Sequence, residues 1–152
     1  MIRDIVMDPD PRLRALCLPV LDVDDAVRGL IADMFETMYD APGRGLAAPQ
    51  VGVLRRVFVM DATWKEAAET PLVFVNPEIL WRSPEVQRNE EGCLSIPDRP
   101  VQVTRPARVE VMWLDEDGTQ HRGAFDGFEA ACICHEMDHL DGVLILDHEA
   151  AT

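Results

Sequence analysis

The spacing of hydrophobic residues predicts a helix near the start of the chain. Between positions 22 and 39 apolar side chains recur every three or four residues, and Asp22, Asp24 and Asp25 precede them as N-cap and first-turn acids. The apolar positions are Val23, Val27, Leu30, Ile31, Met34, Phe35 and Met38. This stripe predicts one amphipathic helix that ends near Tyr39 and packs into a core. The preceding residues 1–20 contain three X-Pro steps and predict an extended, turn-rich arm.

Shorter apolar runs predict strands in the middle of the chain. RRVFVM (55–60) and PLVFVNPEIL (71–80) flank the polar stretch DATWKEAAET (61–70), which predicts an exposed loop, and Asn76-Pro77 indicates a turn. A second strand group begins at 101, with Asp117-Gly118 at a hairpin tip and His121 alone on a solvated face. From 127 the spacing becomes helical again, and Gly142 is suited to end that helix.

Length and composition are those of an ordinary globular protein. The chain has 152 residues, of which 47% are hydrophobic and 28% charged, and this predicts a single domain spanning 1–152. No apolar run approaches the roughly 20 residues of a membrane span. The N-terminus lacks the apolar segment of a signal peptide. A cytoplasmic location and no membrane partner are therefore expected.

The charge excludes one class of partner. Acidic residues number 28 against 14 basic ones, which gives a formal charge of −14 spread along the chain. Because phosphate binding relies on clustered Lys and Arg, direct binding of nucleic acid is not expected. The four cysteines, in a reducing compartment, are expected to be free or metal-bound rather than paired.

The stretch ICHEMDHLDG (133–142) carries the chemistry. It contains His135, Glu136 and His139, the H-E-x-x-H pattern. On a helix, side chains four residues apart share a face, so the two imidazoles can bind one ion, and Glu136 can reach a metal-bound water without filling a ligand position. These residue types suggest metal-assisted hydrolysis. The alternative is a helix whose two histidines are merely solvated or packed.

A metal centre of this kind needs a further protein ligand. The candidates are Cys93, Cys132, Cys134, His121 and His148. Cys132 lies one turn before His135, and three ligands along one straight helix diverge by about 10 Å. Cys134 points away from the histidine face, and His148 lies in a charged tail. Cys93 belongs to another segment of the chain, so it can close a coordination that the helix alone cannot.

Two loops have compositions suited to a site. In NEEGCLSIP (89–97), Gly92 frees the backbone beside Cys93, and Leu94 can present its N–H to a ligand. In APGRGLAAPQVG (41–52), Gln50 is a polar amide among apolar neighbours, so it is either a hydrogen-bonded core residue or a site group. The glycines of this second loop do not match a phosphate-binding pattern.

Three motifs together resemble one known family. GRGLAAPQ (43–50), EGCLS (91–95) and HEMDHLDG (135–142) look like the three signature motifs of the peptide deformylases, in the same order. They cover about a seventh of the chain, and the predicted helix and strands between them extend the resemblance nearly from end to end. The resemblance implies an α+β domain, with antiparallel sheets packed around the H-E-x-x-H helix and an N-terminal amphipathic helix.

The resemblance also implies an activity and a cofactor. Members of the family remove the formyl group from the N-terminal methionine of nascent polypeptides and release formate. By position, Cys93, His135 and His139 would hold the metal, Fe²⁺ in the first place, with Zn²⁺, Ni²⁺ or Co²⁺ as alternatives. Such an iron–thiolate centre should be sensitive to oxygen.

The remaining roles follow by position in the same way. Glu136 would act as general base and then acid, and the amide of Gln50 and the backbone N–H of Leu94 would stabilise the oxyanion. The resemblance assigns substrate contacts to Arg44, Gly45, Glu91, Gly92, Phe128 and Cys132.

The chain departs from the family pattern at four positions. Arg44 and Asn89 stand where pocket-lining aliphatic residues are usual, Cys134 replaces a Gln, and Pro100 takes the place of a peptide-holding Arg, with Arg99 one position early. These positions concern substrate recognition, so they affect the expected specificity more than the reaction type. Alternatively, Arg44 simply points to solvent.

Three functions remain open from the sequence. The first is a deformylase acting on formyl-methionyl peptides; the second is a related amidohydrolase for another N-formylated compound; the third is a metal-binding paralogue without turnover. The presence of Glu136 argues against the third. A general metallopeptidase is a weaker alternative, because most take their third metal ligand from a downstream His or Glu, and the tail offers only His148 and Glu149. A monomer is expected. Many bacterial members continue into a C-terminal helix, whereas this chain ends at Thr152, so a transient ribosome contact is expected only if it does not need that helix.

Overall fold

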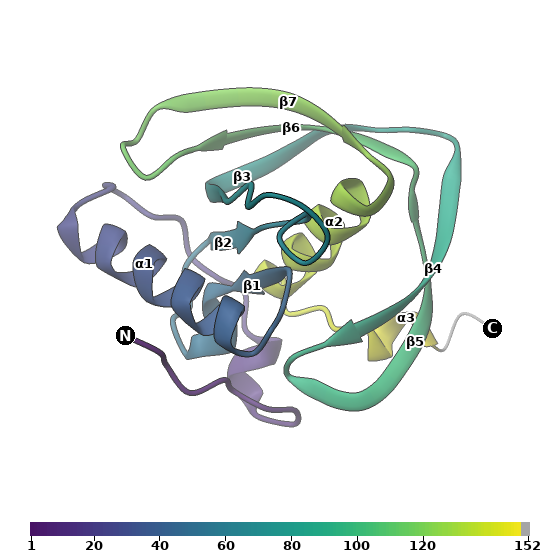
Figure 1. Ribbon diagram of the computed structural model, residues 1–152, viewed down its shortest axis with the longest axis horizontal. Coiled ribbons are helices and arrows are strands. Elements are labelled where there is room, and N and C mark those ends of the chain that lie inside the picture. Colours follow the sequence, from purple (N-terminus) through teal and green to yellow (C-terminus); the bar gives the residue numbers. More distant parts are fainter. Residues whose placement is uncertain (150–152) are drawn as a thin grey trace.

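Antiparallel strands form the main sheet, which lies between two helices. The computed structural model describes residues 1–149, so the chain end at Thr152 lies outside the described residues. Within that range the sheet has the strand order β1 (Gly45–Ala47), β2 (Val57–Met60), β3 (Leu72–Arg82), β6 (Arg108–Leu114) and β7 (Gln120–Asp126). Helix α1 (Asp25–Asp40) and helix α2 (Gly127–Leu140) pack against it (Figure 1).

Alternation along β2 separates two hydrophobic cores. Phe58 and Met60 pack with α2 residues such as Ile133, whereas Val57 and Val59 pack with the Met and Leu stripe of α1. Because successive side chains of a strand point to opposite faces, the continuous run 57–60 is buried on both faces of the sheet. This explains why β2 lacks the polar alternation of a half-exposed strand.

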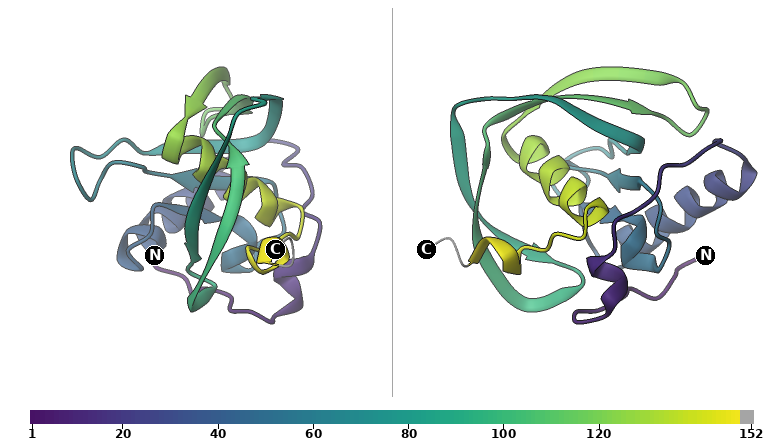
Figure 2. Two further views of the ribbon diagram at one scale, coloured as in Figure 1. Left: turned by 90° about the vertical axis from the view of Figure 1, so that its right-hand side faces the viewer. Right: turned by 180° about the vertical axis from the view of Figure 1, so that it is seen from behind.

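A separate hairpin closes the fold beside α2. Strands β4 (Val86–Cys93) and β5 (Ile96–Pro106) pair only with each other in the described part of the chain, and Figures 1 and 2 show them running past α2. Residues 96–103 of β5 pack on the N-terminal arm and on the segment before α3 (Leu146–Glu149). This third core consists of Val6, Leu13, Ile96, Val101, Val103, Leu144 and Ile145.

The expected turn at Asn76-Pro77 is wrong, because β3 continues through it. The register between β3 and β6 shifts between Val75 and Glu78, which is a bulge. Asn76 has a φ of 47°, and its side-chain amide forms two hydrogen bonds of 2.8 Å with the backbone of Val20. A left-handed Asn before a Pro suits a bulge as well as a turn, and here the arm stabilises the bulge.

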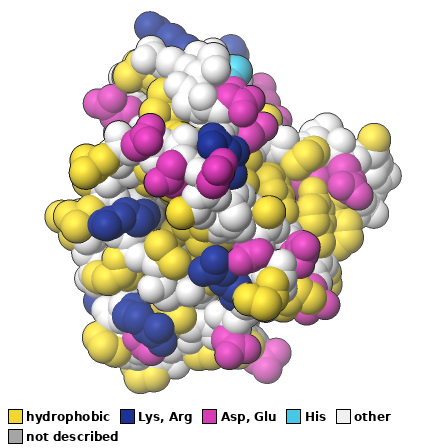
Figure 3. Space-filling model, turned by 90° about the vertical axis from the view of Figure 1, so that its left-hand side faces the viewer, with side chains coloured by type: hydrophobic (Ala, Val, Ile, Leu, Met, Phe, Trp, Pro, Cys, Tyr) yellow, Lys and Arg dark blue, Asp and Glu magenta, His cyan; other side chains and the backbone are white. Residues whose placement is uncertain are grey.

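His121 is exposed, as expected, but it is not alone. Its Nε2 lies 2.6 Å from Asp115 Oδ2, and its ring stacks on that of Trp113 with the centroids 5.6 Å apart. On the face of the molecule seen in Figure 3, basic side chains are scattered among acidic and hydrophobic ones rather than gathered in one patch. None of the helices within residues 1–149 has the length and apolar character that crossing a membrane requires.

Candidate metal centre

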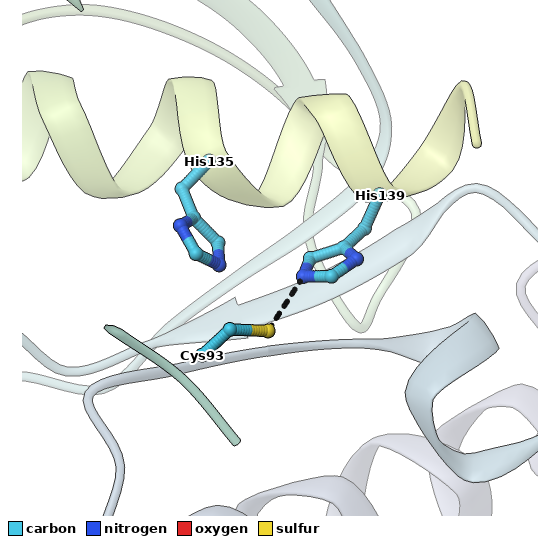
Figure 4. A group of neighbouring side chains, drawn as sticks. All are labelled: Cys93, His135 and His139. Atoms are coloured by element: carbon cyan, nitrogen blue, oxygen red, sulfur yellow. Dashed lines mark hydrogen bonds between the residues drawn. The ribbon is translucent and has the colours of Figure 1, made fainter. Parts of the chain in front are cut away.

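The H-E-x-x-H helix and the β4–β5 hairpin bring three donor side chains together. His135 and His139 point from one face of α2 toward Cys93, which ends β4 (Figure 4). Their ligand atoms all lie within 4.8 Å of one another, and Cys93 Sγ is 3.5 Å from His139 Nε2. The two histidines converge because they are four residues apart on a helix. Cys93 lies at the end of β4, where the β4–β5 register shifts between Glu91 and Cys93.

This donor set fits a divalent metal ion. One thiolate and two imidazoles are the ligands of a site that keeps a fourth position open for water or substrate. Burial keeps the pKa of His139 well below its usual value, so this ring is neutral and free to coordinate. Burial lowers the pKa of His135 as well, but Glu136, Cys93 and Glu91 together raise it to about 10. The carboxyl groups of Glu136 and Glu91 therefore favour a positive charge at this point.

Glu136 lies beside the three donors without joining them. It is 3% exposed, and its Oε1 is buried with no hydrogen-bond partner in the described chain. Burial raises its pKa to about 7. A Cβ atom added at Gly45 would lie 2.5 Å from Glu136 Oε2 and 3.0 Å from Cys132 Sγ. Gly45 is thus needed for close approach of β1 to this carboxylate, which is poised to exchange a proton near neutral pH.

A network of ion pairs contacts His135 at its Nδ1 atom. Its Nδ1 lies 2.9 Å from Glu91 Oε1, and Glu91 accepts two hydrogen bonds of 2.9 Å from Arg105. Arg105 also donates to Asp138 at 2.6 Å, and Asp138 Oδ2 lies 3.0 Å from His148 Nε2. Burial tends to raise the pKa of Glu91, but the bonds from Arg105 and His135 lower it to about 2. The ionised carboxylate therefore orients the imidazole, as carboxylates behind metal-binding histidines commonly do.

Gln50 is 2% exposed and hydrogen-bonded through both atoms of its amide, as expected for the first of its two alternatives, and it lies beside Cys93. Its Oε1 accepts from the N–H of Ala47 at 3.0 Å, and its Nε2 donates to Ser95 Oγ at 3.1 Å and to Cys93 Sγ at 3.7 Å. The N-terminal arm fixes this corner, because the N–H of Val6 donates to the Gln50 carbonyl at 2.7 Å. The amide is therefore held with its donor group next to Cys93.

A cleft of about 710 Å³ opens onto the donors. All six expected substrate contacts line it: Arg44, Gly45, Glu91, Gly92, Phe128 and Cys132. Gln50, Leu94 and Glu136 line it as well, and so do the departures Asn89 and Pro100. Cys134 instead packs in the core beneath the sheet. Gly92 has no left-handed φ, so the backbone freedom expected there is not used.

The other candidate ligands lie apart from the three donors. In residues 1–149 the group able to share one ion at this site consists of Cys93, His135 and His139. Cys132 belongs to the cleft wall, and burial raises its pKa well above the usual value, which opposes the thiolate form that metals bind. His148 contacts Asp138 and His121 contacts Asp115, so neither points to the donors.

Several residues of the site were given no role from the sequence. Ser95 and Arg105 act through contacts with segments far away in the chain. The loop 61–70, expected only to be exposed, brings Lys65 to the rim of the cleft. Arg105 is 4% exposed, and a lone Arg in a strand pattern could have been noted as a buried charge in need of partners.

Comparisons with known proteins agree on one family. The sequence model of the family described as "Polypeptide deformylase" matches residues 2–152. A peptide deformylase from Rhizorhabdus wittichii is 53% identical, with 97% of this chain and 86% of that protein covered. The crystal structure of the peptide deformylase from Thermotoga maritima is 40% identical with a TM-score of 0.92, covering 97% of both chains.

A further solved structure is similar along almost its whole length. It is a Met-Ala-Ser-bound peptide deformylase from Acinetobacter baumannii, 34% identical with a TM-score of 0.91, and the match covers 97% of this chain and 98% of that one. The three donors, the adjacent carboxylate and the cleft thus occur in a chain that matches these proteins in sequence and in fold. The chain belongs to the polypeptide deformylase family.

Proposed function

We propose that this protein removes the N-formyl group from the N-terminal formyl-methionine of nascent polypeptides, releasing formate. The observation that carries the proposal is the convergence of Cys93, His135 and His139 beside the buried Glu136, at the bottom of a cleft. Family membership supports the same activity and makes the protein a metallo-hydrolase. We further infer that 1–152 act as one catalytic domain and as a monomer, and that any ribosome contact is transient.

The donor set supports a metal cofactor. We infer that Cys93, His135 and His139 hold one divalent ion, Fe²⁺ in the first place and Zn²⁺, Ni²⁺ or Co²⁺ as alternatives. When bound, it supplies a Lewis acid that activates water and polarises the formyl group. The thiolate favours a soft or borderline ion over Mg²⁺ or Ca²⁺.

The protein's own groups would move the protons and hold the charge. Glu136 takes a proton from the attacking water and returns it to the amine nitrogen when the C–N bond breaks, leaving formate and a free amino group. Gln50 Nε2 and the N–H of Leu94 donate to the oxygen that becomes negative on the formyl carbon. The contacts of Gln50 with Ser95 and Cys93 support this role because they fix its orientation.

The cleft suits an extended peptide. The Acinetobacter baumannii relative binds Met-Ala-Ser, and we propose that a formyl-methionyl peptide lies in the corresponding place here. Arg44, Gly45, Glu91, Gly92, Phe128 and Cys132 would contact it. Asn89 and Pro100, at the wall of the same cleft, would influence which side chains fit.

Formate release tests the proposal. Protein purified without oxygen and loaded with Fe²⁺ is incubated with formyl-Met-Ala-Ser and with matched formyl amino acids and amides that lack methionine. We expect the formyl-Met peptide to have the highest kcat/KM. Hydrolysis confined to another formylated compound would replace the proposed substrate, and stoichiometric metal with no hydrolysis of any formyl amide would indicate a non-catalytic paralogue.

A further inference from the structure

Arg44 does not point freely into solvent, although it stands in a loop beside the cleft. Its guanidinium pairs with Glu66 and lies over the ring of Phe128, 5.3 Å from the centroid. Its side chain is 29% exposed, and its Nε is buried with no acceptor in the described chain. A cation is therefore held at the rim of the substrate cleft with one donor unused.

The loop 61–70 is built against this rim. Asp61, which is fully buried, accepts hydrogen bonds from Tyr39 Oη at 2.6 Å and from the N–H groups of Thr63 and Thr70 at 3.2 and 3.1 Å. The indole of Trp64 donates to the Gly43 carbonyl at 3.0 Å. The loop is thereby attached at its base and at the residue next to Arg44, so its charged residues keep a defined place on the cleft.

The charges of the cleft are unevenly distributed. Lys65 lines the cleft beside Arg44, and no described carboxylate pairs with it. Across the cleft the hairpin contributes Glu90 and Asp98, while the Arg99 guanidinium pairs with Glu149 at 2.8 Å. One rim is thus cationic and the other acidic.

The Arg44–Glu66 pair is able to exchange partners. The Glu66 side chain is 64% exposed, and an ion pair with so exposed a carboxylate contributes little stability because water competes for both groups. A carboxylate in the cleft could replace Glu66, gain the planar donors of the guanidinium and lie within the field of Lys65. The aromatic ring beneath would keep the guanidinium in place meanwhile.

The geometry points to Arg44 as a specificity-determining residue that favours formyl-methionyl peptides with an acidic side chain in the first or second position after the methionine. The inference rests on the proposed function. Arg44 adjoins Gly45, where an added Cβ atom would lie only 2.5 Å from Glu136 Oε2, and an extended peptide advances only about 3.3–3.6 Å per residue. A substrate side chain close behind the formyl-methionine therefore lies within reach of the rim.

The test compares matched peptides within each protein variant. Formyl-Met-Glu-Ala and formyl-Met-Ala-Glu are compared with their Gln counterparts, all as C-terminal amides, in 0.15 M salt so that the net charge of −14 is screened. For at least one position we expect wild-type kcat/KM to favour Glu over Gln by about threefold to tenfold. The ratio should fall to about one in Arg44→Leu and rise above the wild-type value in Glu66→Gln.

A matched control and a second readout keep the result decisive. Arg122→Leu removes a cation that pairs with Glu110 on β6–β7, outside the cleft, and should keep the wild-type ratio. Equal rates for Glu and Gln peptides in wild type, or a ratio unchanged in Glu66→Gln, would overturn the inference while leaving deformylation intact. No formate from any peptide would instead refute the proposed function. Peptide binding, measured by calorimetry, would then test the Glu preference without turnover.

Discussion

Glu91 Oε1, on β4, lies 2.9 Å from His135 Nδ1, on α2. Replacing this carboxylate by the Glu91→Gln substitution keeps the shape but removes the charge that Arg105 and His135 share. Because such supporting contacts orient a ligand and raise its basicity, we expect metal affinity to fall by about 10-fold to 100-fold. Competition with a chromophoric chelator measures it.

Glu78→Gln is the matched control for this prediction. Glu78 is an exposed carboxylate on β3, remote from the donors, so its loss should leave metal affinity at the wild-type value. Equal affinity of the Glu91→Gln protein and wild type would contradict the supporting role.

The same carboxylate makes stability depend on acid. Burial raises the pKa of Glu91, but Arg105 and His135 lower it from 4.5 to about 2 in the folded protein. A lowered folded-state pKa stabilises the fold fully above the unfolded value near 4.5, and this contribution is lost as the pH falls toward about 2. The full difference is on the order of 3 kcal/mol.

Urea unfolding at pH values between 5 and 2 checks this dependence. The free energy of unfolding of wild type should decrease more steeply over this interval than that of Glu91→Gln, which has no proton to take up at this position. Parallel curves for the two proteins would show that Glu91 is not ionised in the folded state, against the account given above.

Gly45 is predicted to be required for turnover rather than for metal binding. In Gly45→Ala the new methyl group would meet the Glu136 carboxylate at 2.5 Å and the Cys132 sulfur at 3.0 Å, so the carboxylate must move. We expect kcat to fall by at least about 10-fold, because general acid–base catalysis depends on that placement, with metal content unchanged.

Gly29→Ala provides the comparison. Nothing lies within 4 Å of a Cβ at Gly29 in α1, and Ala favours a helix over Gly by about 1 kcal/mol. This variant should retain activity and unfold at higher urea concentration. A Gly45→Ala enzyme as active as Gly29→Ala would show that Glu136 tolerates displacement.

The two cysteines near the helix should differ in their effect on metal. Cys93→Ser replaces the sulfur that lies 3.5 Å from His139 Nε2 by a weaker ligand, so affinity for Zn²⁺ or Fe²⁺ should fall strongly. Cys132 lies on the cleft wall outside the donor group, and Cys132→Ser should leave the affinity nearly unchanged. Metal dissociation constants measured for the two variants test this difference. An equal loss of metal affinity in both would mean that the thiol ligand is wrongly assigned.

Local spacing predicts the parts of this protein that depend on neighbours along the chain. His135, Glu136 and His139 lie within two helical turns, so their order alone places them together. The helical stripe likewise falls in α1 (Asp25–Asp40) from Val27 to Met38, whereas Val23 lies just before the N-cap Asp24. Cys93 could be chosen from the sequence only because a helix cannot supply three converging ligands and because its surrounding motif resembles a family.

Contacts between distant segments could not be predicted, because hydrophobic periodicity indicates only how neighbouring residues along the chain are arranged. Arg105 joins Glu91 and Asp138 across 14 and 33 residues, and Arg44 joins Glu66 across 22. Asn76-Pro77 shows the other limit: a left-handed Asn and a Pro without an N–H fit a turn and a bulge equally well. Only the packing of the arm at Val20 against Asn76 selects the bulge.

The most direct measurement of the central claim is formate release from formyl-Met-Ala-Ser, with metal content determined on the same samples, in wild type and Glu136→Gln. We expect both proteins to bind about one ion through Cys93, His135 and His139. We expect only wild type to turn over, with Glu136→Gln slower by at least about 100-fold. Formate release at the wild-type rate by a metal-loaded Glu136→Gln protein would contradict the account.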